Sequence, residues 1–349
     1  QTNFSYLDMI PTAQIKKLRE ALETSARPLI FFDDDPDGLC SFLQFYKLNP
    51  ESYGVIYKRA GPLDETFLNK VEEVQPDAIF ILDIAQVSQD FLNKVSNVFW
   101  LDHHAPQTLK KVTYLNPMVK SKGEDNSPTS LWAHKITNVS NWLACVGTVG
   151  DWHLPTKDMR KDLEEEYPDL LPKNIKRPED ALFGSDLGRL ARMFSFILKG
   201  HNKLAMTCAK VLTRIKSPYE ILDQSSSQGK YIHKQFTKVN AMYEELKNSI
   251  KITDDPLILY NYEHNKTSLT SDLSNEILYE NPSKFIIISR FRNGDHKCSL
   301  RSTKYEVLPI LKKALEGLSG YGGGHLHACG ANVPERDWKQ FLENIKEQL

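Results

Sequence analysis

Short apolar runs alternate with amphipathic segments along the first third of the chain. Residues 28–32, 78–82 and 98–101 are almost entirely apolar, and an acidic residue follows each run directly. Between these runs, residues 38–48 and 64–74 carry apolar residues at helical spacing. Strands that are apolar on both faces and alternate with helices are typical of a parallel sheet covered on both sides. The pattern therefore predicts an α/β domain with a parallel sheet.

The rest of the chain divides into a helical middle and a second alternating region that starts at Pro256. This second region has the size of a small α/β domain. We expect three parts, namely an N-terminal domain at 1–200, a helical connector at 201–252 and a C-terminal domain at 253–349. The polar segment 155–178 is expected to be a surface excursion. The tryptophans of the middle region are expected to pack in the core or between domains; they are Trp132, Trp142 and Trp152.

The composition of the 349 residues, 40% hydrophobic and 26% charged, suits folded domains rather than a disordered chain. No apolar run approaches the ~20 residues that span a bilayer, and the N-terminal residues lack the features of a signal peptide. The five cysteines are scattered, which favours a reducing compartment. We therefore expect a soluble, cytoplasmic protein without a membrane partner. The net charge is only −1, so the chain has no overall positive field that would attract a polyanion. Nucleic acid would therefore have to bind in a local groove.

Acidic residues stand where the predicted strands end. The segment DDDPDG at 33–38 follows the first apolar run, Asp83 and Asp102 follow the next two, and Asp151 ends the helical run GTVGD. The carboxyl ends of parallel strands line one crevice, so these side chains are expected to converge. Any one of them alone is as typical of a helix cap or a turn. Together they favour a common site.

Carboxylates held close together repel one another unless cations lie between them. Oxygen-rich sites with one or two imidazoles suit Mn²⁺ or Mg²⁺, and His103 and His104 directly follow Asp102. Two such ions can activate water for attack on phosphorus. The residues therefore predict hydrolysis of a phosphoester or phosphoanhydride.

These motifs resemble those of the DHH phosphoesterase superfamily, and the C-terminal region resembles its DHHA1 domain. The motifs are DDDPDG at 33–38, Asp83, DHH at 102–104, GTVGD at 147–151, Arg301-Ser302 and GGGH at 322–325. They span nearly the whole chain in the right order. The resemblance implies a parallel-sheet DHH catalytic domain and a smaller α/β DHHA1 substrate-binding domain, joined by the helical connector.

The resemblance also implies how the metal centre is built. Asp35 and Asp37 would each bind one of two Mn²⁺ ions, with Mg²⁺ as the alternative, and Asp83 would bridge the two ions. His103 would complete the shell of one ion and Asp151 the shell of the other.

Two residues of the DHH motif would act beside the ions. Asp102 would fix the ring of His103, and His104 would contact the scissile phosphate or orient a ligand. One position departs from the superfamily pattern, because many members have a histidine where this chain has Phe31. Asp33 would either replace that ligand or brace the loop, and both readings stay open.

The C-terminal glycine run would let backbone N–H groups approach a phosphate closely and form a nest for it. Taken alone, such a run is as typical of a flexible turn. The residues expected to bind substrate in this domain are Gly322, Gly323, Gly324, His325, Arg301 and Ser302.

The form of the motifs and the compact length are similar to the RecJ-like branch of the superfamily, in its archaeal type. The resemblance implies an exonuclease that hydrolyses single-stranded DNA or RNA to mononucleotides, with replication or repair proteins open as partners. One alternative is a nano-RNase or cyclic-dinucleotide phosphodiesterase. Another is a non-catalytic replication scaffold of the Cdc45 kind, against which the intact ligand motifs argue.

Overall fold

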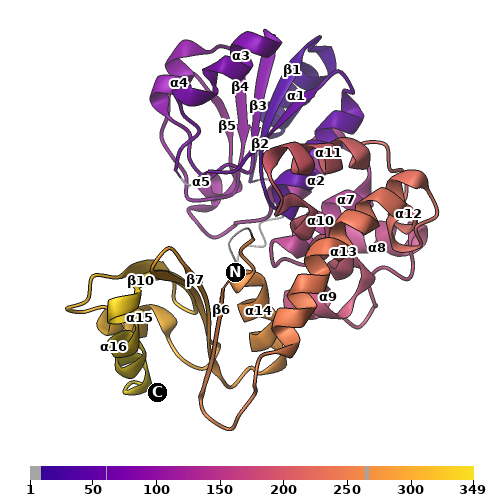
Figure 1. Ribbon diagram of the computed structural model, residues 1–349. Helices are drawn as coiled ribbons and strands as arrows, with labels where there is room; N and C mark the ends of the chain where they lie inside the picture. The colour runs from indigo at the N-terminus through magenta and orange to yellow at the C-terminus, as the bar shows by residue number, and fades with distance from the viewer. Residues whose placement is uncertain (1–8, 60, 264–266) are drawn as a thin grey trace. The chain divides into compact units, whose positions relative to one another are not determined.

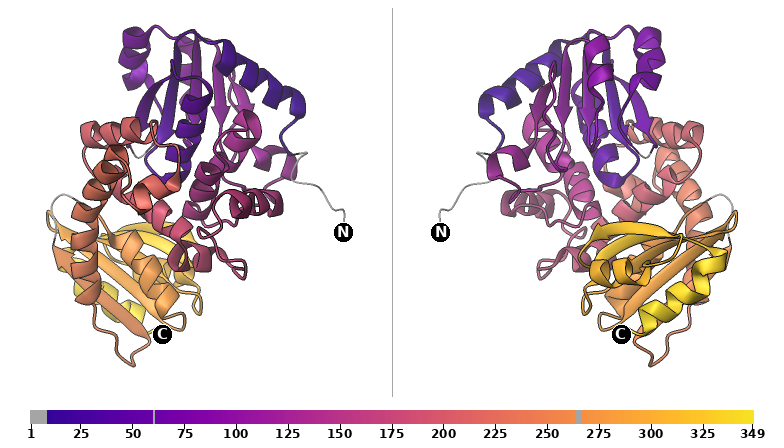
Figure 2. Two further views of the ribbon diagram at one scale, coloured as in Figure 1. Left: turned by 90° about the vertical axis from the view of Figure 1, so that its right-hand side faces the viewer. Right: turned by 90° about the vertical axis from the view of Figure 1, so that its left-hand side faces the viewer.

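The computed structural model describes residues 9–59, 61–263 and 267–349, and Figures 1 and 2 show its ribbon. The chain falls into two compact units, unit 1 (Gln1–Thr237) and unit 2 (Lys238–Leu349). The division lies inside helix α13 (Ser227–Asn248). Among the described helices, none combines the length and the apolar character that crossing a bilayer requires. The expectation that the N-terminal residues form no signal peptide falls partly on residues 1–8, which lie outside the described residues.

A five-stranded sheet forms the first half of unit 1. All of its pairs are parallel, in the order β2-β1-β3-β4-β5, as the apolar runs predict. The strands are β1 (Pro28–Asp33), β2 (Tyr53–Tyr57), β3 (Ala78–Leu82), β4 (Val98–Leu101) and β5 (Thr113–Leu115). In this doubly wound order, ligands bind beyond the carboxyl ends of the strands.

Helices cover the sheet of unit 1 and continue beyond it in the chain (Figure 2). They are α1 (Thr12–Thr24), α2 (Pro36–Leu48), a 3-10 turn (Glu65–Phe67), α3 (Leu68–Val74), α4 (Gln89–Lys94), α5 (Pro117–Ser121), α6 (Thr129–Thr137), α7 (Asn141–Gly150), α8 (Lys157–Glu166), α9 (Pro178–Gly184), α10 (Asp186–Leu198), α11 (Asn202–Leu212) and α12 (Pro218–Leu222). The expected surface excursion at 155–178 contains α8, which buries Met159 and Leu163. The excursion is therefore a packed amphipathic helix and its loops.

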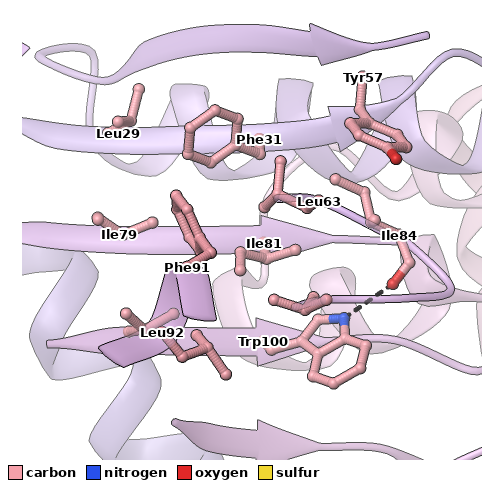
Figure 3. Packing of buried hydrophobic residues seen from close by; sticks show 12 residues of the cluster. Leu29, Phe31, Tyr57, Leu63, Ile79, Ile81, Ile84, Phe91, Leu92 and Trp100 are labelled. Carbon is pink, nitrogen blue, oxygen red and sulfur yellow. Dashed lines mark hydrogen bonds between the residues drawn. The ribbon is translucent and has the colours of Figure 1, made fainter. Parts of the chain in front are cut away.

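The two faces of the sheet bury alternate residues of the strands. On one face, Phe31 and Trp100 pack with side chains of α3 and α4, and the indole N–H of Trp100 donates to the carbonyl of Ile84 at 3.0 Å (Figure 3). On the other face, Phe32 stacks on Phe42 of α2 with ring centroids 4.3 Å apart. Burial on both faces is the reason that these strands read as continuous apolar runs.

Unit 2 is built on a mixed sheet in the order β6-β7-β8-β10-β9. Strand β6 pairs parallel with β7, and the other pairs are antiparallel. Helices α15 and α16 share a buried core with this sheet, and α14 packs on β7 and β8. Its elements are β6 (Leu257–Glu263), α14 (Thr270–Glu280), β7 (Phe285–Arg292), β8 (Asp295–Arg301), α15 (Val307–Ala314), β9 (Tyr321–His325), β10 (Ala328–Pro334) and α16 (Glu335–Lys346). The predicted second α/β domain is confirmed.

Candidate metal centre

The candidate site of unit 1 lies where β1, β3 and β4 end. These strands are neighbours in the sheet. Asp33 is the last residue of β1, and Asp83 and Asp102 directly follow β3 and β4. The backbone N–H of Asp83 donates to the carbonyl of Leu101 at 3.0 Å, so the ladder extends to this residue. The sheet thus brings the three carboxylates to one edge, as predicted.

Asp83 is buried and has a backbone conformation that is unusual for a residue with a side chain. Its φ is +62°, in the left-handed region, which costs on the order of 1 kcal/mol. Its Oδ1 accepts a hydrogen bond from Thr129 Oγ1 at 2.9 Å and lies 3.4 Å from His103 Nε2. Burial, and then the charges of Asp37 and Asp35, raise the pKa of Asp83 well above its usual value. A strained, buried carboxylate beside an imidazole is typical of a functional site.

Helix α2 begins at Pro36, directly after the short turn that follows β1. Asp35 caps this helix, because its Oδ1 accepts from the backbone N–H of Gly38 at 2.8 Å, and Pro36 is the first helical residue. Asp37 therefore lies in the first turn of α2, which begins two residues before the helical pattern at 38–48. Only glycine fits at position 38, since a Cβ there would lie 2.6 Å from the carbonyl oxygen of Asp33.

The carboxylate of Asp37 is buried against the start of helix α6. Its Oδ2 accepts from the backbone N–H of Thr129 at 2.7 Å, and its Oδ1 from that of Ser130 at 2.8 Å. The N-terminal amides of a helix favour a negative charge, yet burial and the charge of Asp151 still raise the pKa of Asp37. Each carboxylate oxygen has a second acceptor position, so Asp37 can bind a cation in addition to the helix.

His103 stands between these carboxylates. Its Nδ1–H donates to the carbonyl of Asn126 at 2.9 Å, which leaves Nε2 as the acceptor nitrogen of the neutral ring. Nε2 lies 3.4 Å from Asp83 Oδ1 and 3.9 Å from Asp37 Oδ2. Asp151 approaches from the end of α7, with its Oδ2 3.7 Å from His103 Nδ1.

Five side chains form two overlapping groups in which the ligand atoms lie within 4.8 Å of one another. One group is Asp37, His103 and Asp151, and the other is Asp83, His103 and His104. The donors are carboxylate oxygens and imidazole nitrogens, which suit Mn²⁺ or Mg²⁺ better than thiolate-bound metals. Burial and repulsion from neighbouring carboxylates raise the pKa values of Asp37 and Asp83, and a divalent cation would relieve that repulsion. The residues therefore fit the expected ions.

Asp102 binds His104 rather than His103. The Nδ1–H of His104 donates to Asp102 Oδ1 at 2.7 Å, and the backbone N–H of His104 donates to Asp102 Oδ2 at 3.0 Å. Our expectation that Asp102 fixes the ring of His103 is wrong, because the carbonyl of Asn126 accepts that ring's N–H instead. Burial alone would lower the pKa of His104, but the hydrogen bond and charge of Asp102 outweigh it and raise the pKa. Asp102 thus fixes the tautomer of His104 and holds its ring in place.

Replacing Asp102 with asparagine should lower the rate of hydrolysis about 10–100-fold, as loss of an outer partner of a site histidine typically does. The amide cannot stabilise the charged ring of His104, so the change acts on the chemistry. Steady-state kinetics would measure it, with Asp90→Asn as the control, since Asp90 makes the same change of carboxylate to amide at an exposed position of α4. An unchanged kcat in Asp102→Asn would contradict a catalytic part for this pair.

Asp33 and Asp35 lie near the two ligand groups but belong to neither of them among the described residues. Burial and the charge of Asp34 raise the pKa of Asp33 to about 6. Burial and the charge of Asp33 raise the pKa of Asp35 to about 8. The raised pKa values show that both carboxyl groups lie in a buried, acidic environment beside the ligand groups, and their ligand roles stay predictions.

Two residues that contact this site, His153 and Asn126, were not predicted from the sequence. His153 contacts Asp151 twice, since its Nδ1 lies 2.7 Å from the carbonyl oxygen and 3.4 Å from Oδ2. Its Nε2 lies 3.3 Å from Oδ1 of Asn126, whose carbonyl holds His103. The sequence signal for His153 is the DWH triplet at 151–153. Asn126 has no such signal, because it lies in a loop remote from every motif.

In unit 2, the glycine run forms a strand instead of a phosphate nest. Residues 321–325 are the edge strand β9, and they pair antiparallel with β10 and are exposed. A nest needs a curved backbone, so an extended strand corrects that expectation. Gly324 has a φ of +146°, and a Cβ there would lie 2.4 Å from the carbonyl oxygen of Ala328, so the strand requires glycine at this position. Gly322, Gly323 and His325 lie on the same exposed edge, and their binding of substrate stays a prediction.

Arg301 and Ser302 are engaged inside unit 2. The guanidinium of Arg301 donates through Nε to Asn275 Oδ1 at 2.8 Å, through Nη1 to the carbonyls of Leu300 and Cys329, and through Nη2 to Ser271 Oγ at 3.2 Å. The buried hydroxyl of Ser302 donates to the carbonyl of Lys284 at 3.0 Å. These contacts give both side chains a structural role, and their contact with substrate stays a prediction.

Replacing Arg301 with alanine should therefore destabilise unit 2 by about 2 kcal/mol, since it removes charge-assisted hydrogen bonds and leaves their acceptors unpaired. Denaturant unfolding of the full chain would measure the loss. Arg336→Ala is the control, because Arg336 is exposed and its contacts with Ser319 and Asp337 are worth little. A wild-type unfolding midpoint together with a raised KM would show that Arg301 serves substrate instead.

The sequence of residues 257–349 matches the DHHA1 domain family. A search of curated proteins with the whole sequence finds no match.

Solved structures match over nearly the whole chain. RecJ of Thermus thermophilus, in complex with Mn²⁺, is 16% identical with a TM-score of 0.62, and the match covers 98% of this chain and 55% of that one. An exonuclease RecJ bound to manganese is 15% identical with a TM-score of 0.60, covering 97% and 95%. The DHH domain of a member of the s1p family of ribosomal proteins is 14% identical with a TM-score of 0.64, covering 97% and 90%. The chain thus spans about half the length of the Thermus protein, and at these identities the likeness establishes the fold.

Proposed function

This chain has the RecJ-like fold of the DHH/DHHA1 superfamily and carries its DHHA1 domain, and on that premise we propose that it is a metal-dependent phosphodiesterase. Its substrate is single-stranded DNA or RNA, which it degrades as an exonuclease to mononucleotides. The observation that carries this proposal is the pair of ligand groups that share His103.

Two divalent cations, Mn²⁺ or Mg²⁺, would be held by the carboxylates of these groups and the imidazole of His103. When bound, the ions would supply Lewis-acid activation of water and charge neutralisation at the phosphate. In this proposal Asp35 and Asp37 would each bind one ion and Asp83 would contribute to both, while His103 would complete the shell of one ion and Asp151 that of the other.

The chain's own residues prepare this centre before substrate arrives. Asp37 is fixed by two backbone amides of α6, and Asp83 by the hydroxyl of Thr129. Preorganised groups cost little reorganisation during the reaction. Hydrolysis forms a bond from water oxygen to phosphorus and breaks the bond to the leaving oxygen, which takes up a proton. We assign that proton to Nε2 of His104, because Asp102 holds its Nδ1–H and favours the protonated ring.

The test uses the purified full chain with Mn²⁺ and four substrates: a 5′-labelled 20-mer, a 3′-labelled 20-mer, a dinucleotide and a cyclic dinucleotide. We expect mononucleotides to be released successively from one end of the 20-mer. Turnover of the short or cyclic substrates alone would instead support the nano-RNase or cyclic-dinucleotide phosphodiesterase alternative. A chain that binds Mn²⁺ but hydrolyses none of them would support the scaffold alternative of the Cdc45 kind.

A further inference from the structure

Trp152 stands between two residues of the candidate metal centre, Asp151 and His153, and its side chain is exposed. The residue is 41% exposed, whereas the four other tryptophans of the chain are at most 8% exposed. Of the two expected environments for Trp152, the core or an interface between domains, the core is therefore wrong. An exposed indole loses the free energy that burial of its apolar surface would provide.

The backbone at Trp152 is also unfavourable for a bulky residue. Its φ is +59°, in the left-handed region that favours glycine. This conformation is imposed by the end of helix α7, where the N–H of Trp152 donates to the carbonyl of Val149 at 3.1 Å and the N–H of His153 to that of Thr148 at 3.0 Å. Strain of this kind at a functional site indicates that the side chain itself serves a purpose.

The ring of Trp152 is held in a defined orientation. It packs against Phe183 of α9 with ring centroids 5.8 Å apart and an interplanar angle of 68°. This edge-to-face contact restricts the indole without burying it. An exposed aromatic ring that is oriented in advance costs little further entropy when it binds a ligand.

We propose that Trp152 stacks on a nucleobase of the nucleotide whose phosphate lies at the metal centre. The position is suitable because the adjacent Asp151 belongs to a ligand group and His153 contacts Asp151. Stacking accepts every base, so this residue selects nucleotide phosphodiesters over small phosphoanhydrides without reading sequence. The proposal rests on the proposed phosphodiesterase function.

The test compares two 20-mers, one of which carries abasic sites at its two terminal positions at each end. Trp152→Ala should raise the KM for the ordinary 20-mer about tenfold, the effect expected for loss of one base–aromatic stack, and change kcat little. Trp152→Phe should keep most of the affinity. The wild type should show the same raised KM on the abasic 20-mer, and Trp152→Ala should add nothing further there, because the two changes remove one interaction.

Tyr53→Ala is the matched control. Tyr53 is an exposed aromatic residue of unit 1, 38% exposed, at the start of β2 and so at the end of the strand away from the site. Its kinetics should be those of the wild type. An unchanged KM in Trp152→Ala, or an equal rise on both 20-mers, would overturn the stacking while leaving the phosphodiesterase in place. A wild-type chain that hydrolyses no oligonucleotide would overturn both.

Discussion

The Asp83→Asn protein should hydrolyse substrate at least about 10³-fold more slowly than the wild type, a barrier increase on the order of 4 kcal/mol. The amide keeps the shape of the side chain and its hydrogen bond from Thr129, and asparagine tolerates the left-handed backbone at this position. Only the negative charge is lost, and with it the proposed bridge between two cations.

The same substitution should leave the metal-free protein as stable as the wild type or more stable. Burial and neighbouring carboxylates raise the pKa of Asp83 in the folded protein, so its ionised form opposes folding at neutral pH. Melting temperatures in chelator would measure this.

Asp37→Ala provides the contrast, since it should also lose activity but destabilise the protein by about 1–2 kcal/mol, because two helix amides lose their acceptor. Wild-type turnover by Asp83→Asn, or its failure to fold, would remove Asp83 from the centre.

Removing metal should abolish activity, and restoring Mn²⁺ should recover it. The buried carboxylates of the two ligand groups repel one another without cations, so a bound ion stabilises the folded state. At a free Mn²⁺ concentration a hundred times the dissociation constant, the gain is about 2.7 kcal/mol. For a unit of this size that corresponds to a rise in melting temperature of roughly 5–10 °C.

The measurement is a thermal melt of the full chain, dialysed against EDTA and then titrated with Mn²⁺ or Mg²⁺. Asp83→Asn is the control, in which the rise should shrink or disappear. Full turnover in excess EDTA after dialysis would exclude the metal centre altogether.

The edge of the sheet that carries the site was predictable from the sequence. Burial on both faces makes β1, β3 and β4 read as apolar runs, and an acidic residue marks the end of each one. The parallel arrangement then requires those ends to meet. The second α/β domain was predictable for the same reason, since its strands and helices alternate with clear periodicity.

The partners of the site residues were not predictable. Adjacency in the sequence suggested that Asp102 serves His103, but the backbone after β4 directs the ring of His104 back to Asp102. The real partner of His103 is the carbonyl of Asn126, and every residue type carries a carbonyl. The glycine run likewise permitted both a turn and a strand, and pairing with β10 decided for the strand.

Asp37 accepts two hydrogen bonds from the backbone of α6, so it stabilises the fold as well as the proposed metal centre. An aspartate at this position in another chain of the same fold therefore need not indicate catalysis. Any relative that gave up catalysis would still need an acceptor for the first amides of that helix, so selection for folding alone would preserve an aspartate there. Its presence is therefore weak evidence of an active enzyme. His104, whose side chain is 42% exposed, and Asp151, whose side chain is 27% exposed, do less for the fold. In a survey of related genomes, loss of those two residues would be the earlier sign that a copy had become a pseudoenzyme.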